Sequence, residues 1–210
     1  MDVYKTEEEQ VEAIKKWWNE NGKSIIAGII IGIIGIFGWR AYDDNIIVQA
    51  EQASVIYEKM IVASRTSDEE NVLVYANRII SDYKSSTYAI FASLMLAKIA
   101  AEAAELEQAE THLRWILANN SQVEFEHVAR LRLARVLIAS DKLKLASEML
   151  DINDSGDFIA RYDELRGDIY VRQNRPDEAM KAYEKSLANT KGSADGQSIL
   201  KMKLNNLGRS

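Results

Sequence analysis

Residues 24–39 read SIIAGIIIGIIGIFGW, sixteen positions without a charge between Lys23 and Arg40. A bilayer is crossed by about 20 apolar helical residues, at about 1.5 Å each. The span is short, but the stems of Lys23 and Arg40 can extend to the interface, which also suits Trp39 and Tyr42. A buried core helix is the alternative, yet such a helix is rarely isoleucine-rich on all sides between strongly polar neighbours. We therefore expect a single membrane anchor over residues 24–42.

The flanks of this span indicate that it is not cleaved and give it an orientation. A signal peptide begins with a short basic region and ends at a small-residue cleavage site. Here 23 residues of mixed charge come first, and no A-x-A pattern follows. Lys15, Lys16 and Lys23 precede the span, whereas Arg40 alone directly follows it. Because basic residues favour the cytoplasmic side, we expect a cytoplasmic N-terminus and residues 43–210 on the far side.

Residues 1–23 are predicted to form a short amphipathic helix. Thr6 and Glu9 have the spacing of a capping box. Val11, Ile14 and Trp18 then fall on one helical face. This tail is either a small docking element or an interfacial lead-in that merely orients the anchor, and composition favours the second.

Within the span, Gly28, Gly32 and Gly35 share one side of a helix. Gly28 and Gly32 have the G-x-x-x-G spacing that lets a second helix approach closely. Glycine is also common in membrane helices for other reasons. The anchor residues predicted are Gly28, Gly32, Gly35 and Trp39.

Composition limits what the rest of the chain can be. The chain has no cysteine, which removes disulfides, thiolate metal sites and thiol nucleophiles. The region after Arg40 carries 21 Lys+Arg and 26 Asp+Glu without a basic block, so no nucleic-acid binding is expected. Ala, Leu, Glu, Lys and Arg dominate there, with Pro176 as the one proline and no alternating strand pattern. These features predict an all-α domain of paired helices.

A repeat of about 34 residues emerges when three alanines are aligned. Ala109, Ala146 and Ala179 are separated by 37 and 33 residues. A small residue stands twelve positions before each of these alanines: Ala97, Ala134 and Gly167. A large residue stands four positions after each: Leu113, Leu150 and Tyr183. This pattern resembles tetratricopeptide repeats, in which small residues let paired helices pack closely. The alternative is a generic helical bundle with coincidental alanines.

The predicted turns agree in part. Residues 173–176 offer a turn, with Pro176 at the first position of the next helix. Residues 140–141 and 105–107 occupy the corresponding places, although the latter contain no helix breaker. Residues 50–64 and 71–83 are expected to form an earlier, atypical pair.

The tetratricopeptide resemblance implies a concave face lined by the first helix of each pair. An apolar floor with basic residues at one end and mixed charge at the other would suit an extended peptide. Most of these apolar residues could equally be buried core. The predicted groove residues are Phe91, Leu94, Lys98, Val128, Leu131, Arg135, Arg161, Glu164 and Asp168.

Nothing in the chain predicts an enzyme, and we expect no catalytic residue, cofactor or metal site. His112 and His127 fall on different predicted helices without a carboxylate constellation and read as surface or packing residues. Asp151, Asp154 and Asp157 recur every three residues, but the spacing and terminal glutamate of a calcium loop are missing.

The chain as a whole resembles the YfgM family of ancillary SecYEG translocon subunits. The resemblance rests on the leader over residues 4–24, the glycine-rich span ending in Gly38-Trp39-Arg40, and the tail from Met202 to Leu207. It implies a bacterial inner-membrane protein with residues 1–23 in the cytosol and a periplasmic tetratricopeptide-like domain over residues 43–210. It also implies association with the translocon and with the periplasmic chaperone PpiD, and restraint of the stress regulator RcsB through the cytosolic tail.

Three functions compete on these grounds. The first is a membrane-tethered adaptor that helps to pass newly exported polypeptides to periplasmic chaperones. The second is an envelope-stress regulator that acts on RcsB through residues 1–23. The third is a structural envelope scaffold that assembles through the glycine face of the anchor.

Overall fold

The computed structural model describes residues 7–120, 122–190 and 194–208. Within these residues the chain forms nine α-helices, one 3-10 helix and no strand, which confirms the all-α prediction. The contacts divide the chain into two compact units, Met1–Gln49 and Ala50–Ser210.

The first helix, α1 (Glu7–Arg65), carries the apolar span. The prediction that residues 1–23 form a helix is confirmed from Glu7 onward, but the helix is not short, because α1 continues without interruption through Lys23 and Ser24. No proline interrupts this stretch, so nothing forces the backbone to leave the helix. Thr6, the predicted cap, lies outside the described residues.

The apolar part of α1 has the length and composition of a membrane span. Among the described residues, one candidate span is found, at Glu9–Arg40. Its large side chains are exposed: Ile31 is 70% and Trp39 72% accessible. A water-soluble helix would bury such a face, so this segment needs an apolar environment outside the chain.

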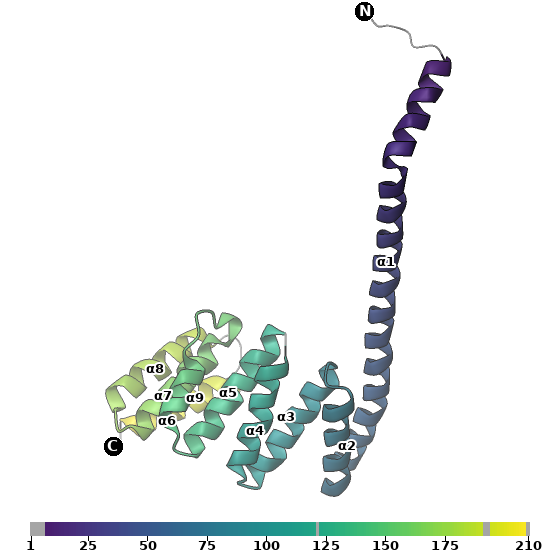
Figure 1. Ribbon diagram of the computed structural model, residues 1–210. Coiled ribbons are helices and arrows are strands. Elements are labelled where there is room, and N and C mark those ends of the chain that lie inside the picture. The colour runs from purple at the N-terminus through teal and green to yellow at the C-terminus, as the bar shows by residue number, and fades with distance from the viewer. Residues whose placement is uncertain (1–6, 121, 191–193, 209–210) are drawn as a thin grey trace, which may run out of the picture. The chain divides into compact units, whose positions relative to one another are not determined.

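The unit from Ala50 onward is a stack of helical pairs (Figure 1). The C-terminal part of α1 pairs with α2 (Glu69–Asp82). The next pairs are α3 (Thr87–Glu102) with α4 (Leu106–Asn119), and α5 (Val123–Ala139) with α6 (Leu143–Leu150). A 3-10 turn, η1 (Gly156–Phe158), precedes the pair of α7 (Ile159–Arg172) and α8 (Pro176–Asn189), and α9 (Ala194–Leu207) follows.

The predicted small residues lie where the helices of a pair meet. In the three pairs from α3 to α8, the twelve-residue offset joins one buried small residue in the first helix to one in the second. The residues are Ala97 with Ala109, Ala134 with Ala146, and Gly167 with Ala179. The large partners Leu113, Leu150 and Tyr183 are at most 3% exposed. The alanine periodicity therefore reports real helix packing.

The pair of α1 and α2 keeps the same offset with the sizes reversed. Met60 and Val72, twelve residues apart, replace the two small residues, and Ala76 replaces the large one. All three are at most 2% exposed. The sizes are redistributed between the positions, so an alanine alignment does not detect this pair.

Every first helix ends in the same way. Ser67, Ala104, Asp141 and Asn174 have positive φ angles between 56° and 61°. The amide of the following residue then donates to a carbonyl five residues earlier, with N···O distances of 2.8–2.9 Å, as in Asp68 to Ala63 and Arg175 to Tyr170. This is the Schellman arrangement, here built without glycine. Pro176 begins α8 as predicted.

Candidate functional site

The predicted groove residues of α3 and α5 differ widely in exposure. Phe91, Leu94 and Val128 are half-buried, whereas Lys98 and Arg135 are exposed. Leu131 is only 5% exposed and belongs to the main core cluster. Its side chain therefore offers little surface to a partner, as expected if it is a packing residue.

Phe91 is part of a continuous row of aromatic rings. The ring centroids of Tyr57 and Tyr88 are 5.3 Å apart, those of Tyr57 and Phe91 5.9 Å, and those of Phe91 and Phe125 5.4 Å. All four rings are half-buried. We call Tyr57, Tyr88, Phe91 and Phe125 the aromatic row. It joins first helices of three successive pairs by edge-to-face and tilted contacts.

Sequence reasoning found only Phe91 in this row, although a signal for two others exists. Tyr88, Phe125 and Phe158 are separated by 37 and 33 residues, the same spacing as the three alanines. Each stands nine residues before the small residue of its first helix. Aligning aromatic residues as well as alanines would have found Tyr88 and Phe125.

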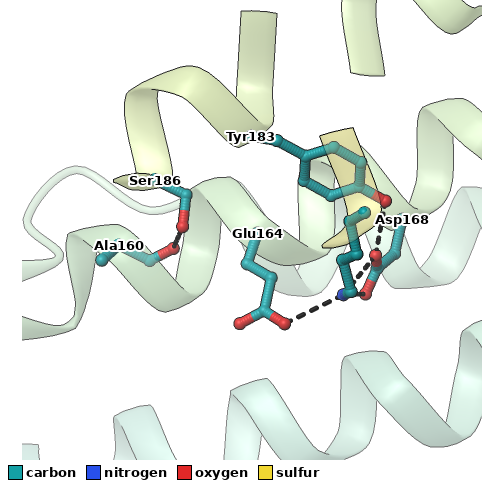
Figure 2. Close-up of polar contacts among 6 residues, drawn as sticks. Ala160, Glu164, Asp168, Tyr183 and Ser186 are labelled. Atoms are coloured by element: carbon teal, nitrogen blue, oxygen red, sulfur yellow. Dashed lines mark hydrogen bonds and ion pairs between the residues drawn. The ribbon is translucent and has the colours of Figure 1, made fainter. Parts of the chain in front are cut away.

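The predicted groove residues of α7 are already engaged by another part of the chain. Arg161 is exposed, but Glu164 and Asp168 both bind Lys203 of α9 (Figure 2). The Lys203 ammonium lies 2.9 Å from Glu164 and 2.6 Å from Asp168. Its nitrogen also lies 5.5 Å from the ring centroid of Tyr183. We call Lys203, Glu164, Asp168 and Tyr183 the Lys203 cluster.

Tyr183 connects this cluster to helix packing. Its hydroxyl donates to Asp168 at 2.7 Å, and its ring covers Gly167. Burial raises the pKa of Tyr183 well above its ordinary value, and the carboxylate of Asp168 raises it further, so the phenol stays protonated. Farther along the same helices, Ser186 donates to the carbonyl of Ala160 at 2.7 Å (Figure 2).

The histidines occupy packing positions. His127 is 9% exposed, and its Nδ1 lies 3.0 Å from the hydroxyl of Tyr162. Its ring stacks on Phe158 at a centroid distance of 4.9 Å. His112 is half-buried on α4, and burial lowers its pKa. These contacts give His127 a packing role, and the half-buried position of His112 agrees with its interpretation as a surface or packing residue.

The aspartates of the α6–η1 loop are not gathered around a common point. Asp154 caps the loop by accepting a hydrogen bond from the Gly156 amide at 2.9 Å. Among the described residues, no group of three or more histidine or carboxylate side chains could hold a metal ion.

The glycines of the anchor face open space. A Cβ at Gly28, Gly32 or Gly35 would meet nothing within 4 Å beyond the local backbone of α1, among the described residues. This side of α1 is therefore accessible to a neighbouring helix, and its use as a packing face stays a prediction.

Comparison with known families agrees with this architecture. A family model described as a tetratricopeptide repeat-like domain matches residues 15–209. The tetratricopeptide-like fold expected from the repeat is therefore confirmed.

Curated relatives align with the chain over almost its whole length. A protein of Haemophilus influenzae named "Ancillary SecYEG translocon subunit" is 35% identical over 206 residues, 98% of this chain and 100% of the relative. A protein of the same name from Escherichia coli K12 is 30% identical over 207 residues, 99% of each chain. The chain belongs to the family of ancillary SecYEG translocon subunits. This confirms the resemblance drawn from the leader, the span and the tail.

A relative of lower sequence identity has the same name. The ancillary SecYEG translocon subunit of Neisseria gonorrhoeae is 27% identical over 208 residues, 99% of this chain and 100% of the relative. No solved structure matches the chain significantly.

Proposed function

We propose that this chain is a membrane-anchored adaptor at the SecYEG translocon, which helps to pass newly exported polypeptides to periplasmic chaperones. The observation that carries the proposal is the joining of one apolar span to a tetratricopeptide-like array in a family named for the translocon. The chain acts by binding other proteins and catalyses no reaction of its own.

The proposed topology follows from the basic residues around the span. Lys15, Lys16 and Lys23 hold residues 1–23 in the cytosol, and residues 24–42 cross the bacterial inner membrane once. Residues 43–210 then form the periplasmic domain. Tethering the array beside the translocon raises its effective concentration, so weak binding of an emerging chain becomes sufficient.

The first-helix face is the proposed binding surface for emerging polypeptides. Phe91, Leu94 and Val128 supply a half-buried apolar floor, and the exposed Lys98, Arg135 and Arg161 supply positive charge. Proteins of this architecture use such faces for extended segments. The periplasmic chaperone PpiD is the proposed partner that receives the polypeptide, as the family resemblance implies.

Affinity purification from membranes in mild detergent tests the adaptor proposal. Full-length protein is compared with a form that lacks residues 1–40, and bound proteins are identified by mass spectrometry. We expect translocon subunits and PpiD with the full-length protein and the loss of translocon subunits from the shortened one. Recovery of cytosolic regulators without translocon subunits would contradict the proposal.

A pair of single substitutions tests the binding surface. Phe91→Asp places a charge within the aromatic row and should abolish crosslinking to a stalled exported chain. Val123→Asp is the matched control, because Val123 is 61% exposed at the start of α5. Leu131 is unsuitable for this test, since a charge at its core position would destabilise the fold. Equal crosslinking by both variants would place the binding surface elsewhere.

A second candidate function is regulation through the cytosolic tail. It is favoured by the exposed apolar face of Val11, Ile14 and Trp18, which are 50%, 67% and 51% accessible. We propose RcsB as the partner of this face, again as the resemblance implies. Residues 1–23 fused to an unrelated membrane anchor should then retain the regulatory effect on RcsB-dependent transcription, and an inert fusion would remove this candidate.

A further inference from the structure

The C-terminal helix α9 has a small apolar contact with the rest of the array. It contributes one buried residue, Leu200, to a cluster with Ala179 and Tyr183 of α8, and its half-buried Leu204 and Leu207 pack against that cluster. Ile199 and Met202 of the same helix are 48% and 57% exposed. A helix with so little buried surface opens at a lower free energy than the helices of the main core.

The packing between α7, α8 and α9 is also incomplete among the described residues. A cavity of about 410 Å³ is lined by side chains from all three helices, including Arg161, Glu164, Asn189 and Ile199. Among the described residues, side chains therefore do not fill the space along this side of α9. Lys203 attaches α9 to α7 through the Lys203 cluster, with charge-assisted hydrogen bonds of 2.6–2.9 Å.

This attachment lies on the face that is proposed to bind polypeptides. Arg161, Glu164 and Asp168 recur at i, i+3 and i+7, so they share one side of α7. The side chains of Glu164 and Asp168 are 16% and 25% exposed, and that of Lys203 is 24% exposed. Both carboxylates are therefore largely covered while Lys203 is bound.

We propose that α9 is an autoinhibitory strap: Lys203 occupies Glu164 and Asp168, and release of α9 opens these carboxylates to a basic side chain of a bound polypeptide. This inference rests on the proposed function, because it assumes that the first-helix face binds extended chains. The partner it specifies is a segment that carries lysine or arginine. Such a segment replaces the ammonium of Lys203 with a like group, so the carboxylates remain paired in both states.

Hydrogen exchange on the purified full-length protein in detergent tests the strap directly. Lys203→Gln removes the charge and should speed exchange of the α9 amides by at least about tenfold, while exchange in α3 to α6 is unchanged. Lys201→Gln is the matched control, because Lys201 is an exposed lysine on the same helix. In the unsubstituted protein, 1 M salt should also speed α9 exchange, since salt screens partly exposed ion pairs.

Peptide binding to the same protein variants tests whether release of α9 opens Glu164 and Asp168 to a basic side chain. The probe is an unstructured peptide of alternating lysine and serine, with a glutamate–serine peptide for comparison. Lys203→Gln should bind the lysine peptide severalfold more tightly than the unsubstituted protein does. Adding Glu164→Gln and Asp168→Asn should remove that gain, and the glutamate peptide should gain nothing.

Two outcomes would overturn the inference. Unchanged α9 exchange in both Lys203→Gln and high salt would mean that Lys203 does not hold the helix. Faster exchange without tighter binding of the lysine peptide would make α9 a structural cap only. Neither outcome affects the adaptor proposal, which is tested by recovery of translocon subunits from membranes.

Discussion

Gly167 is the residue on which the packing of the last pair depends. A Cβ built there would overlap Cε1 of Tyr183 and lie 2.5 Å from Cδ1, and Tyr183 is 3% exposed with its hydroxyl bound to Asp168. Gly167→Ala gains about 1 kcal/mol of helix propensity but overpacks a ring that cannot easily move. We expect a net loss of about 1–2 kcal/mol in the free energy of unfolding, measured by urea denaturation.

The other pairs supply the control for this substitution. Of these, α3–α4 and α5–α6 combine alanine with leucine at the two corresponding positions, as in Ala97 with Leu113. Gly167→Ala combined with Tyr183→Leu should therefore recover part of the loss. If Gly167→Ala alone stabilised the protein, the close approach of α7 and α8 would be less rigid than the structure indicates.

Ala104 has a backbone conformation that suits glycine. Its φ angle is 61°, in the left-handed region that costs an L-residue with a Cβ about 1–2 kcal/mol. Ala104→Gly should stabilise the protein by about 0.5–1 kcal/mol, seen as a higher Tm, after the extra entropy of glycine in the unfolded chain is subtracted. Asn174→Gly should gain less, because asparagine tolerates the same conformation at its φ of 58°. A lower Tm for Ala104→Gly would contradict this account.

His112 gives the protein a pH-dependent stability. Burial lowers its pKa below the unfolded value of about 6.5, so the unfolded chain binds more protons near that pH. Stability should therefore fall as pH drops from 7.5 to 5.5. His112→Gln should reduce this fall in Tm, measured against the unsubstituted protein over the same pH range. An identical pH profile for the two proteins would mean that His112 is not protonated more readily on unfolding.

At the scale of helices, the sequence predicted which helices pair, because residue size at the contact controls pairing. It did not predict where all of the helices end. The twelve-residue offset between small residues located the helices of three pairs, and Pro176 located a helix start. The short helix predicted for residues 1–23 continues past Lys23. A change from an amphipathic to an apolar pattern indicates which solvent surrounds a helix, and it does not indicate where the helix ends. The turn after α3 was expected at residues 105–107 but lies at residues 103–105, since alanine carries no turn signal.

The glycine side of α1 permits a prediction about helix association. A Cβ added at Gly28, Gly32 or Gly35 would meet nothing within 4 Å beyond the adjacent residues and local backbone of α1, among the described residues. If this side packs against a partner helix, Gly28→Leu with Gly32→Leu should abolish that complex in detergent without changing the thermal unfolding of residues 50–210. Ala27→Leu, which also enlarges an exposed apolar side chain of the span but lies off the glycine side, is the control. Intact complexes in the double variant would exclude the scaffold function.

At the scale of the whole molecule, the second compact unit should fold without the first. The clusters that contain Met60, Leu133 and Tyr183 lie within Ala50–Ser210. A polypeptide of residues 50–210 should therefore be soluble and helical by circular dichroism and should unfold cooperatively. Broad, non-cooperative unfolding would mean that residues before Ala50 complete the core.

The candidate site was less predictable than the fold. The first-helix alignment placed Phe91, Leu94 and Val128 at half-buried positions, but it could not separate them from Leu131, which is core. It also could not show that Glu164 and Asp168 bind Lys203, because that contact joins residues 39 and 35 positions apart in a helix outside the repeat. Contacts of this kind depend on where the last helix lies, and periodicity contains no information about that.

The left-handed stop after every first helix has a consequence for how the chain tolerates change. The turn inside each pair contains one residue with a positive φ angle: Ser67, Ala104, Asp141 or Asn174. The twelve-residue offset spans this turn, so it is determined within the pair. An inserted or deleted residue in a connection between pairs therefore leaves the register of the next pair intact. The structural effect of such an insertion or deletion is therefore confined to the connection in which it occurs. The array can diverge in sequence or change its number of pairs while the remaining pairs keep their packing.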